Sequence, residues 1–96
     1  MSRPAQFKFR LYVAGDAPNS HAAVANLKAF CRANLPDRHD FEIIDVLRQP
    51  KLALAEGIFM TPTLIKFSPA PVCRIVGTLS QPQALLQALN LEAVVA

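Results

Sequence analysis

The sequence predicts an α/β fold with a mixed four-stranded sheet and the element order β-α-β-α-β-β-α. Residues 7–13 alternate apolar side chains with Lys8, Arg10 and Tyr12, the two-residue period of a strand. Apolar residues then recur at spacings of three and four across residues 24–35, which indicates a helix with one buried side. A second strand-like run follows at 41–46. A helix between two strands makes them parallel, with a right-handed crossover.

Length and composition predict a single domain over residues 1–96. The chain has 96 residues, of which 52% are hydrophobic and 18% charged, enough to bury a core and too apolar for disorder. No run reaches the roughly 18 apolar residues of a membrane span. The amino end, Met1 to Pro4, also lacks the apolar core of a secretion signal. We therefore expect a cytoplasmic protein with no membrane partner.

Charge and cysteine content favour neither a nucleic-acid binder nor a metal protein. The net charge is +3, but ten basic residues are scattered among seven acidic ones rather than gathered in a stripe. Cys31 and Cys73 lie far apart with no Cys-x-x-Cys motif, so we expect two reduced, mostly buried thiols. We expect no cofactor.

Turn residues give the boundaries of the first helix. Residues 14–20 form a turn after the first strand, followed by a helix that ends near Asn34 to Pro36 and a solvated loop at 37–40. Pro18 suits a first helical turn. The candidate N-cap residues are Asp16, Asn19 and Ser20.

The second half is predicted in the same way. Pro50 opens a short helix through Ala55, and Gly57 stands where a C-cap glycine belongs. Strands at 63–67 and 72–76 are joined by a short proline-containing loop and should form an antiparallel hairpin. Ser80 and Gln83 have capping-box spacing before a final helix.

Residues 58–67 place Pro62 at the head of the third strand. Local sequence leaves open a trans proline at a strand start. The whole element order, however, resembles the thioredoxin-like topology, in which the equivalent proline is cis and lies beside the redox loop after the first strand. That resemblance predicts a cis Thr61–Pro62 bond. Here the loop at 15–20 has no cysteine, so thiol-disulfide exchange at this loop is excluded.

A closer resemblance, over roughly residues 7–91, is to the KaiB family. The matching segments are Leu11-Tyr12-Val13-Ala14-Gly15 with Pro18-Asn19-Ser20, Ile44-Asp45-Val46-Leu47 with Pro50, Thr61-Pro62-Thr63-Leu64 with Lys66, and Pro69, Pro71, Arg74-Ile75 and Gly77 with Leu79-Ser80. The sensor domain of the histidine kinase SasA is similar too. The resemblance implies a non-enzymatic module that binds a KaiC-type ATPase ring in a clock, timer or stress response. By the same resemblance, the partner-binding surface is expected along the second helix and the third strand, with Lys51, Lys66 and Arg74 as the charged contacts.

The resemblance also implies a fold switch, in which family members rest as tetramers with a rearranged carboxy-terminal half. Self-association as a dimer or tetramer is therefore a possible second partnership. Pro62, Pro69 and Pro71 are the candidate switch residues, since cis/trans isomerisation can slow interconversion. Ala88 and Asn90 replace Gly and Asp of the switching clock proteins. Ala favours helix over Gly by about 0.8–1 kcal/mol, so we expect the thioredoxin-like form to be the resting one.

Enzymatic alternatives find less support in the residues. His21 and His39 lack an Asp, Ser or Cys partner at a suggestive spacing. The Gly15 loop follows a strand as phosphate loops do, yet it has one glycine and no Gly-Lys-Ser/Thr. The main alternative is a degenerate thioredoxin-like redox protein using Cys31 or Cys73, and thiol reactivity distinguishes it from a binding module.

Overall fold

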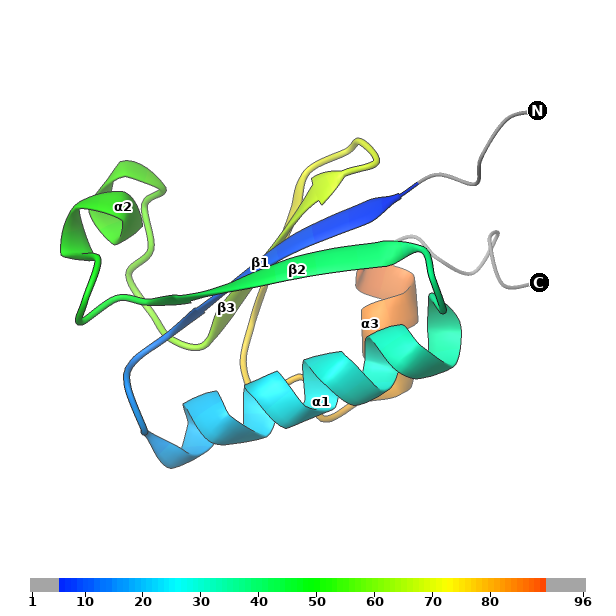
Figure 1. Ribbon diagram of the computed structural model, residues 1–96, viewed down its shortest axis with the longest axis horizontal. Helices are drawn as coiled ribbons and strands as arrows, with labels where there is room; N and C mark the ends of the chain where they lie inside the picture. Colours follow the sequence, from blue (N-terminus) through cyan, green and yellow to red (C-terminus); the bar gives the residue numbers. More distant parts are fainter. Residues whose placement is uncertain (1–5, 90–96) are drawn as a thin grey trace.

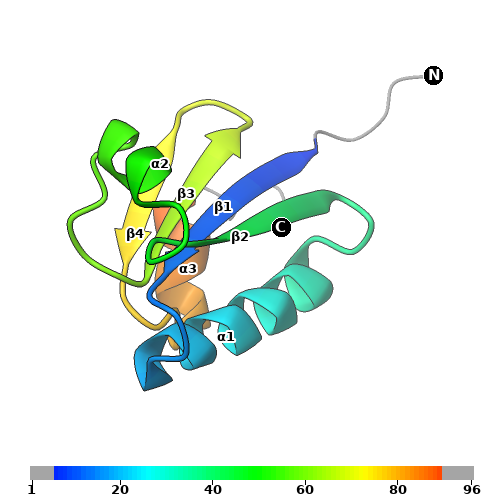
Figure 2. The same ribbon diagram turned by 60° about the vertical axis from the view of Figure 1, so that its left-hand side comes forward.

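The computed structural model describes residues 6–89, and these form seven elements in the predicted order (Figure 1). They are β1 (Phe7–Val13), α1 (Pro18–Asn34), β2 (His39–Asp45), α2 (Pro50–Ala55), β3 (Thr63–Ser68), β4 (Cys73–Val76) and α3 (Pro82–Ala88). The strands lie in the order β2-β1-β3-β4, as Figure 2 shows. β1 is parallel to β2 and antiparallel to β3, which is antiparallel to β4. The predicted α/β thioredoxin-like class and mixed sheet are confirmed.

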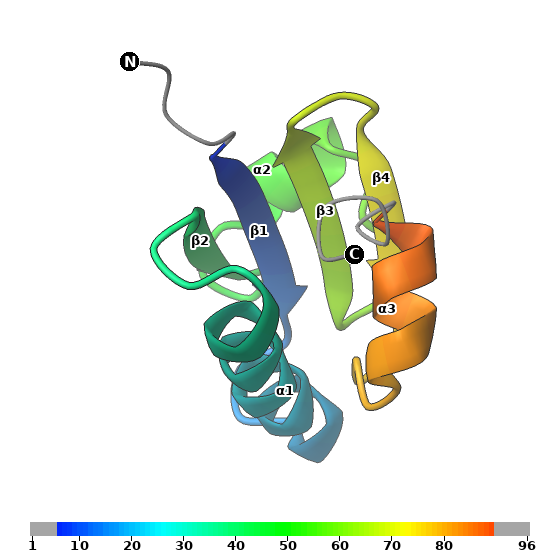
Figure 3. The same ribbon diagram turned by 90° about the vertical axis from the view of Figure 1, so that its right-hand side faces the viewer.

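The helices cover the two faces of the sheet unequally. Figure 3 shows α1 and α3 in front of the sheet and α2 behind it. The larger core lies under α1 and α3, where the alternating apolar residues of β1 meet the apolar stripe of α1. Its buried members include Phe7, Phe9, Leu11, Val13, Leu27, Phe30, Cys31, Leu35, Leu64, Leu85 and Leu89.

A smaller core lies on the opposite face, under α2. Tyr12, Ile44 and Ile65 are buried there, with Leu52 and Ile58 packed against them. Six residues of helix are only about 9 Å long, so α2 covers one end of this face and leaves the other to solvent. Lys8, at that other end, is exposed.

Each helix begins at a proline, at Pro18, Pro50 and Pro82. The predicted side-chain caps are wrong: the N-cap of α1 is Ala17, that of α3 is Gln81, and neither makes a side-chain cap hydrogen bond. Asp16, Asn19 and Ser20 therefore do not cap α1, and Ser80 with Gln83 forms no capping box. Proline at the first turn fixes φ and has no N–H to satisfy, which reduces the need for a capping side chain.

The three predicted switch prolines flank β3. The peptide bonds before Pro62, Pro69 and Pro71 are cis. Pro62 stands at the entrance to β3, and its carbonyl accepts a hydrogen bond from the Gly77 N–H at 3.0 Å. Ala88 is the last residue of α3, whereas Asn90 lies outside the described residues. Within residues 6–89, no helix has the length and apolar character needed to cross a membrane.

Candidate partner-binding surface at α2

Backbone hydrogen bonds fix the end of α2. Gly57, at φ 68°, ends the helix in a left-handed conformation that suits glycine. Its N–H donates to the Leu54 carbonyl at 3.1 Å, and the Ile58 N–H donates to the Ala53 carbonyl at 2.9 Å. These two bonds form a Schellman motif, which confirms the predicted C-cap glycine. Because Ile58 then packs into the smaller core, the chain leaving α2 is held against the sheet.

Large apolar side chains are exposed on α2 and on the loops beside it. Four of them are between 63% and 88% exposed. With the exposed Lys51 they make up what we call the α2 surface: Leu47, Lys51, Leu54, Phe59 and Met60. They lie at the end of the sheet where β1 and β2 finish and β3 begins (Figure 1). Large exposed apolar residues beside a charge are typical of a protein-binding site.

Arg74 joins β4 to the end of α2. Its guanidinium donates to the Glu56 carbonyl and, at 3.5 Å, to the Gly57 carbonyl. These are carbonyls at the C-terminal end of α2, where the helix dipole favours a cation. The side chain is about half exposed, at 47%. The structure therefore places two of the predicted contacts, Lys51 and Arg74, at α2, and Arg74 also positions this helix.

A charged network continues from Arg74 across the sheet. The Glu56 carboxylate lies 3.9 Å from the guanidinium of Arg74 and 3.9 Å from that of Arg10. Arg10 also pairs with Glu42 at 3.1 Å and lies over the ring of Phe67. Its hydrogen bond to the Tyr12 hydroxyl raises the pKa of Arg10 above its usual value. Glu56 thus connects α2 to both β1 and β4, a link that the spacing of these residues in sequence did not reveal.

Lys66 does not lie on this surface. It is 2% exposed, on the face of β3 covered by α3, and its Nζ donates to the Leu89 carbonyl at 3.3 Å. The ammonium would therefore have to leave the core before it could contact a partner, and the predicted contact by Lys66 stays untested. Charge reversal at Lys66 would test the stability of the fold rather than the partner interface.

The redox alternative depends on Cys31 or Cys73, and the structure shows how each of these thiols is buried. Cys31 is fully buried under the sheet, and burial raises its pKa to about 11. At neutral pH it is therefore a thiol and not the nucleophilic thiolate. Cys73 is partly buried on β4 and its Sγ donates to the Pro71 carbonyl at 3.5 Å. Both cysteines are free, and neither lies on the loop after β1.

Solved structures support the fold class. The solution structure of the N-terminal domain of Synechococcus elongatus SasA superposes with a TM-score of 0.76 at 22% identity, covering 98% of this chain and 89% of that one. Chloroplastic thioredoxin z also gives 0.76, at 20% identity, with 92% and 80% covered. At such identities the likeness shows the fold alone. The class is thus a thioredoxin-like domain whose loop after β1 has no cysteine.

Sequence relatives identify the family. The KaiB domain model matches residues 10–91. A Synechocystis protein named circadian clock protein KaiB3 is 44% identical over 82 residues, covering 85% of this chain and 80% of the relative. The circadian clock oscillator protein KaiB of Synechococcus elongatus is 41% identical over 91 residues, covering 95% and 89%. The chain belongs to the KaiB family of circadian clock proteins.

Proposed function

We propose that this protein is a non-enzymatic binding module that docks its α2 surface on a KaiC-type ATPase ring and modulates the activity of the ring in a clock, timer or stress response. The observation that carries the proposal is the 88% exposure of Phe59 in the loop that follows α2, a short helix fixed at its end that itself exposes Lys51 and Leu54. An aromatic side chain that is exposed in the free protein and can be buried by a partner is the kind of anchor that dominates binding energy. The burial of Cys31 argues against a redox role.

Binding of the full chain to the KaiC-type ring of its own host tests the proposal. Phe59→Ala should weaken affinity about tenfold or more, as expected for an interface anchor. Lys51→Glu should weaken it about five- to tenfold by reversing a surface charge. Neither change should unfold the domain, because both side chains are exposed.

Lys8→Glu is the matched control. Lys8 is exposed on the same face of the sheet, at the end not covered by α2, so its charge reversal should leave affinity unchanged. Wild-type affinity for both the Phe59 and Lys51 variants would refute docking through α2. The ATPase rate of the ring with and without the chain tests modulation, and the mass of the free chain in solution tests self-association as a dimer or tetramer.

A further inference from the structure

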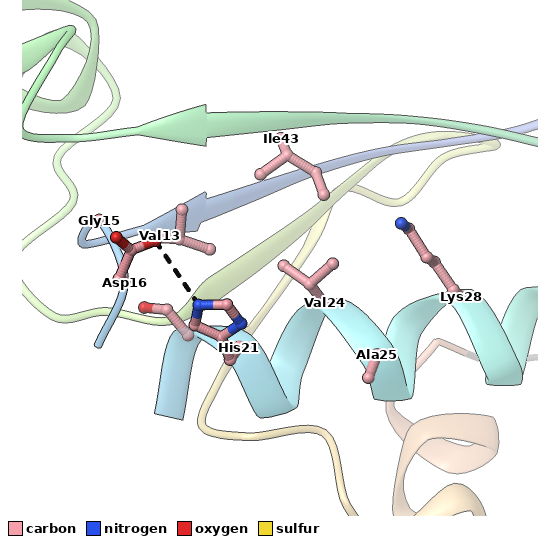
Figure 4. Close-up of a pocket in the computed structure, with 9 residues that line it drawn as sticks. Val13, Gly15, Asp16, His21, Val24, Ala25, Lys28 and Ile43 are labelled. Carbon is pink, nitrogen blue, oxygen red and sulfur yellow. Dashed lines mark ion pairs between the residues drawn. The ribbon is translucent and has the colours of Figure 1, made fainter. Parts of the chain in front are cut away.

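A second site lies away from α2, in a groove between α1 and the edge strand β2 (Figure 4). Its volume is about 450 Å³, within the range of small-ligand sites. Val24 and Ala25 of α1 line one wall, and Val13 and Ile43 of the sheet line the other. Ile43 is 37% exposed although it is a large apolar residue in a strand. The groove therefore offers an apolar surface that the described part of the chain leaves open.

The α1 wall of the groove follows the helical repeat. His21, Val24 and Lys28 stand at helix positions i, i+3 and i+7 and so share one side of α1. In Figure 4 the side chains of Val24 and Lys28 both point toward β2. Seven residues of helix span about 10.5 Å. A ligand that reaches from Lys28 along this wall past Val24 must therefore be extended.

The two ends of the groove differ in charge. At one end the His21 Nε2 lies 3.5 Å from the Asp16 carboxylate, so the imidazole there faces an acidic group. At the other end Lys28 makes no ion pair within 4.0 Å among residues 6–89. Lys28 also borders an adjoining hollow of about 360 Å³ lined by Arg32, His39 and Asp37. Because the two cations Lys28 and Arg32 stand against one carboxylate, that of Asp37, this end favours an anion.

We propose that the groove binds a linear aliphatic carboxylate, such as a free medium-chain fatty acid anion, with its carboxylate at Lys28 and its chain over Val24 and Ile43 toward Val13. The apolar walls supply the affinity, and the charge at Lys28 sets the direction of the chain. This proposal is independent of docking through α2, because the groove lies on the α1 side of the sheet.

Amide-resolved NMR of the full chain, titrated with butyrate, octanoate and decanoate below the concentration at which they aggregate, tests it. Shifts should centre on Val24, Lys28 and Ile43. Affinity should rise about twofold for each added CH₂ group. Full burial of the group would give roughly fourfold, but the groove is open on one side, so only about half of that free energy is gained. Lys28→Glu should weaken decanoate binding about tenfold and Lys28→Gln about threefold, whereas Lys51→Glu on α2 should not change it. Decanol, which lacks the charge, should bind several-fold more weakly than decanoate.

Several results would overturn the proposal. These are the absence of shifts with decanoate, shifts centred on Phe59 and Met60 instead of the groove, equal binding of decanol and decanoate, or binding only above the aggregation concentration. Unchanged affinity in the Lys28 variants would do the same. The spectrum of each free variant reports whether it folds, and Lys28→Gln decides the question if Lys28→Glu does not.

Discussion

Replacing Arg74 with Met should loosen the end of α2 from β4. Methionine keeps most of the aliphatic stem and removes the guanidinium, which bonds the carbonyls of Glu56 and Gly57. Those two carbonyls belong to the C-cap of α2 and the residue just after it. Without the cation they would be bonded by water alone, so the change removes stabilising contacts without creating a cavity in the core.

The size of the effect follows from geometry and exposure. A hydrogen bond from a charged donor contributes about 1.5–3 kcal/mol when it is shielded from water. Arg74 is 47% exposed and its bond to Gly57 is long, at 3.5 Å, so we assign about 1 kcal/mol to its two hydrogen bonds together. The ion pair with Glu56 at 3.9 Å adds about 0.2–1 kcal/mol. Arg74→Met should therefore lower the free energy of unfolding by about 1–2 kcal/mol.

Urea denaturation followed by circular dichroism measures this change, with Arg48→Met as the control. Arg48 lies 4.0 Å from Asp45 and is 88% exposed, so its loss should cost less than about 0.5 kcal/mol. Arg74→Lys should recover only part of the loss, since an ammonium cannot reproduce the fork of the guanidinium. Equal stabilities of the Arg74→Met and Arg48→Met variants would refute the view that Arg74 positions α2.

Three further predictions concern the buried groups and the last helix. Lys66→Met should be neutral or should stabilise the fold by about 1–2 kcal/mol in urea denaturation, because it removes a buried charge and keeps the side-chain volume. Lys66→Glu should unfold the chain. A large loss of stability in the Lys66→Met variant would show that the fold needs the ammonium. Since the pKa of Cys31 rises from 9.0 to about 11 on folding, the unfolded state loses its proton first. Stability should be constant below about pH 9 and fall by about 2–3 kcal/mol toward pH 11, a fall that Cys31→Ala should lack. Ala88→Gly should cost up to about 1 kcal/mol of helix stability and so shift the population about four- to fivefold toward any rearranged form. The NMR spectrum of the wild type should show one set of peaks. Two sets of peaks would contradict a thioredoxin-like resting form.

Most of the fold could be predicted because its elements carry strong local patterns. β1 has strict alternation, and its predicted bounds match the structure. β2 begins at His39 rather than at residue 41, because pairing with Phe7 on β1 extends the strand into a stretch that reads as a polar loop. Tyr12 was grouped with the polar positions, yet it is fully buried. Its burial depends on α2 packing over it, a tertiary contact that no local pattern reveals.

The candidate site could be predicted only where exposure follows from the local element. Lys51 lies on a short helix with one buried side, so its exposure was foreseeable. Lys66 lies on β3, a central strand covered on one face by α3 and on part of the other by α2. The alternation from Leu64 to Lys66 was the available signal, since it puts both side chains on the same face and Leu64 is in the core. Phe59 and Met60 are apolar residues with no helix or strand period around them, so only the structure shows that they are exposed.

The loop after β1 bears on the proposed binding role. Gly15, at φ 53°, donates its N–H to the Asp45 carboxylate at 3.1 Å, and the same oxygen accepts the Leu47 N–H at 2.9 Å. A side chain at Gly15 would meet Leu47 at 3.3 Å, so the space beside the loop is already filled by an apolar residue of the α2 surface. In the redox members of this fold the loop presents thiols next to the proline that precedes the third strand. Here the same end of the sheet exposes Leu47, Phe59 and Met60. These side chains have no thiol to exchange, and in the proposed complex they would contribute binding energy through burial.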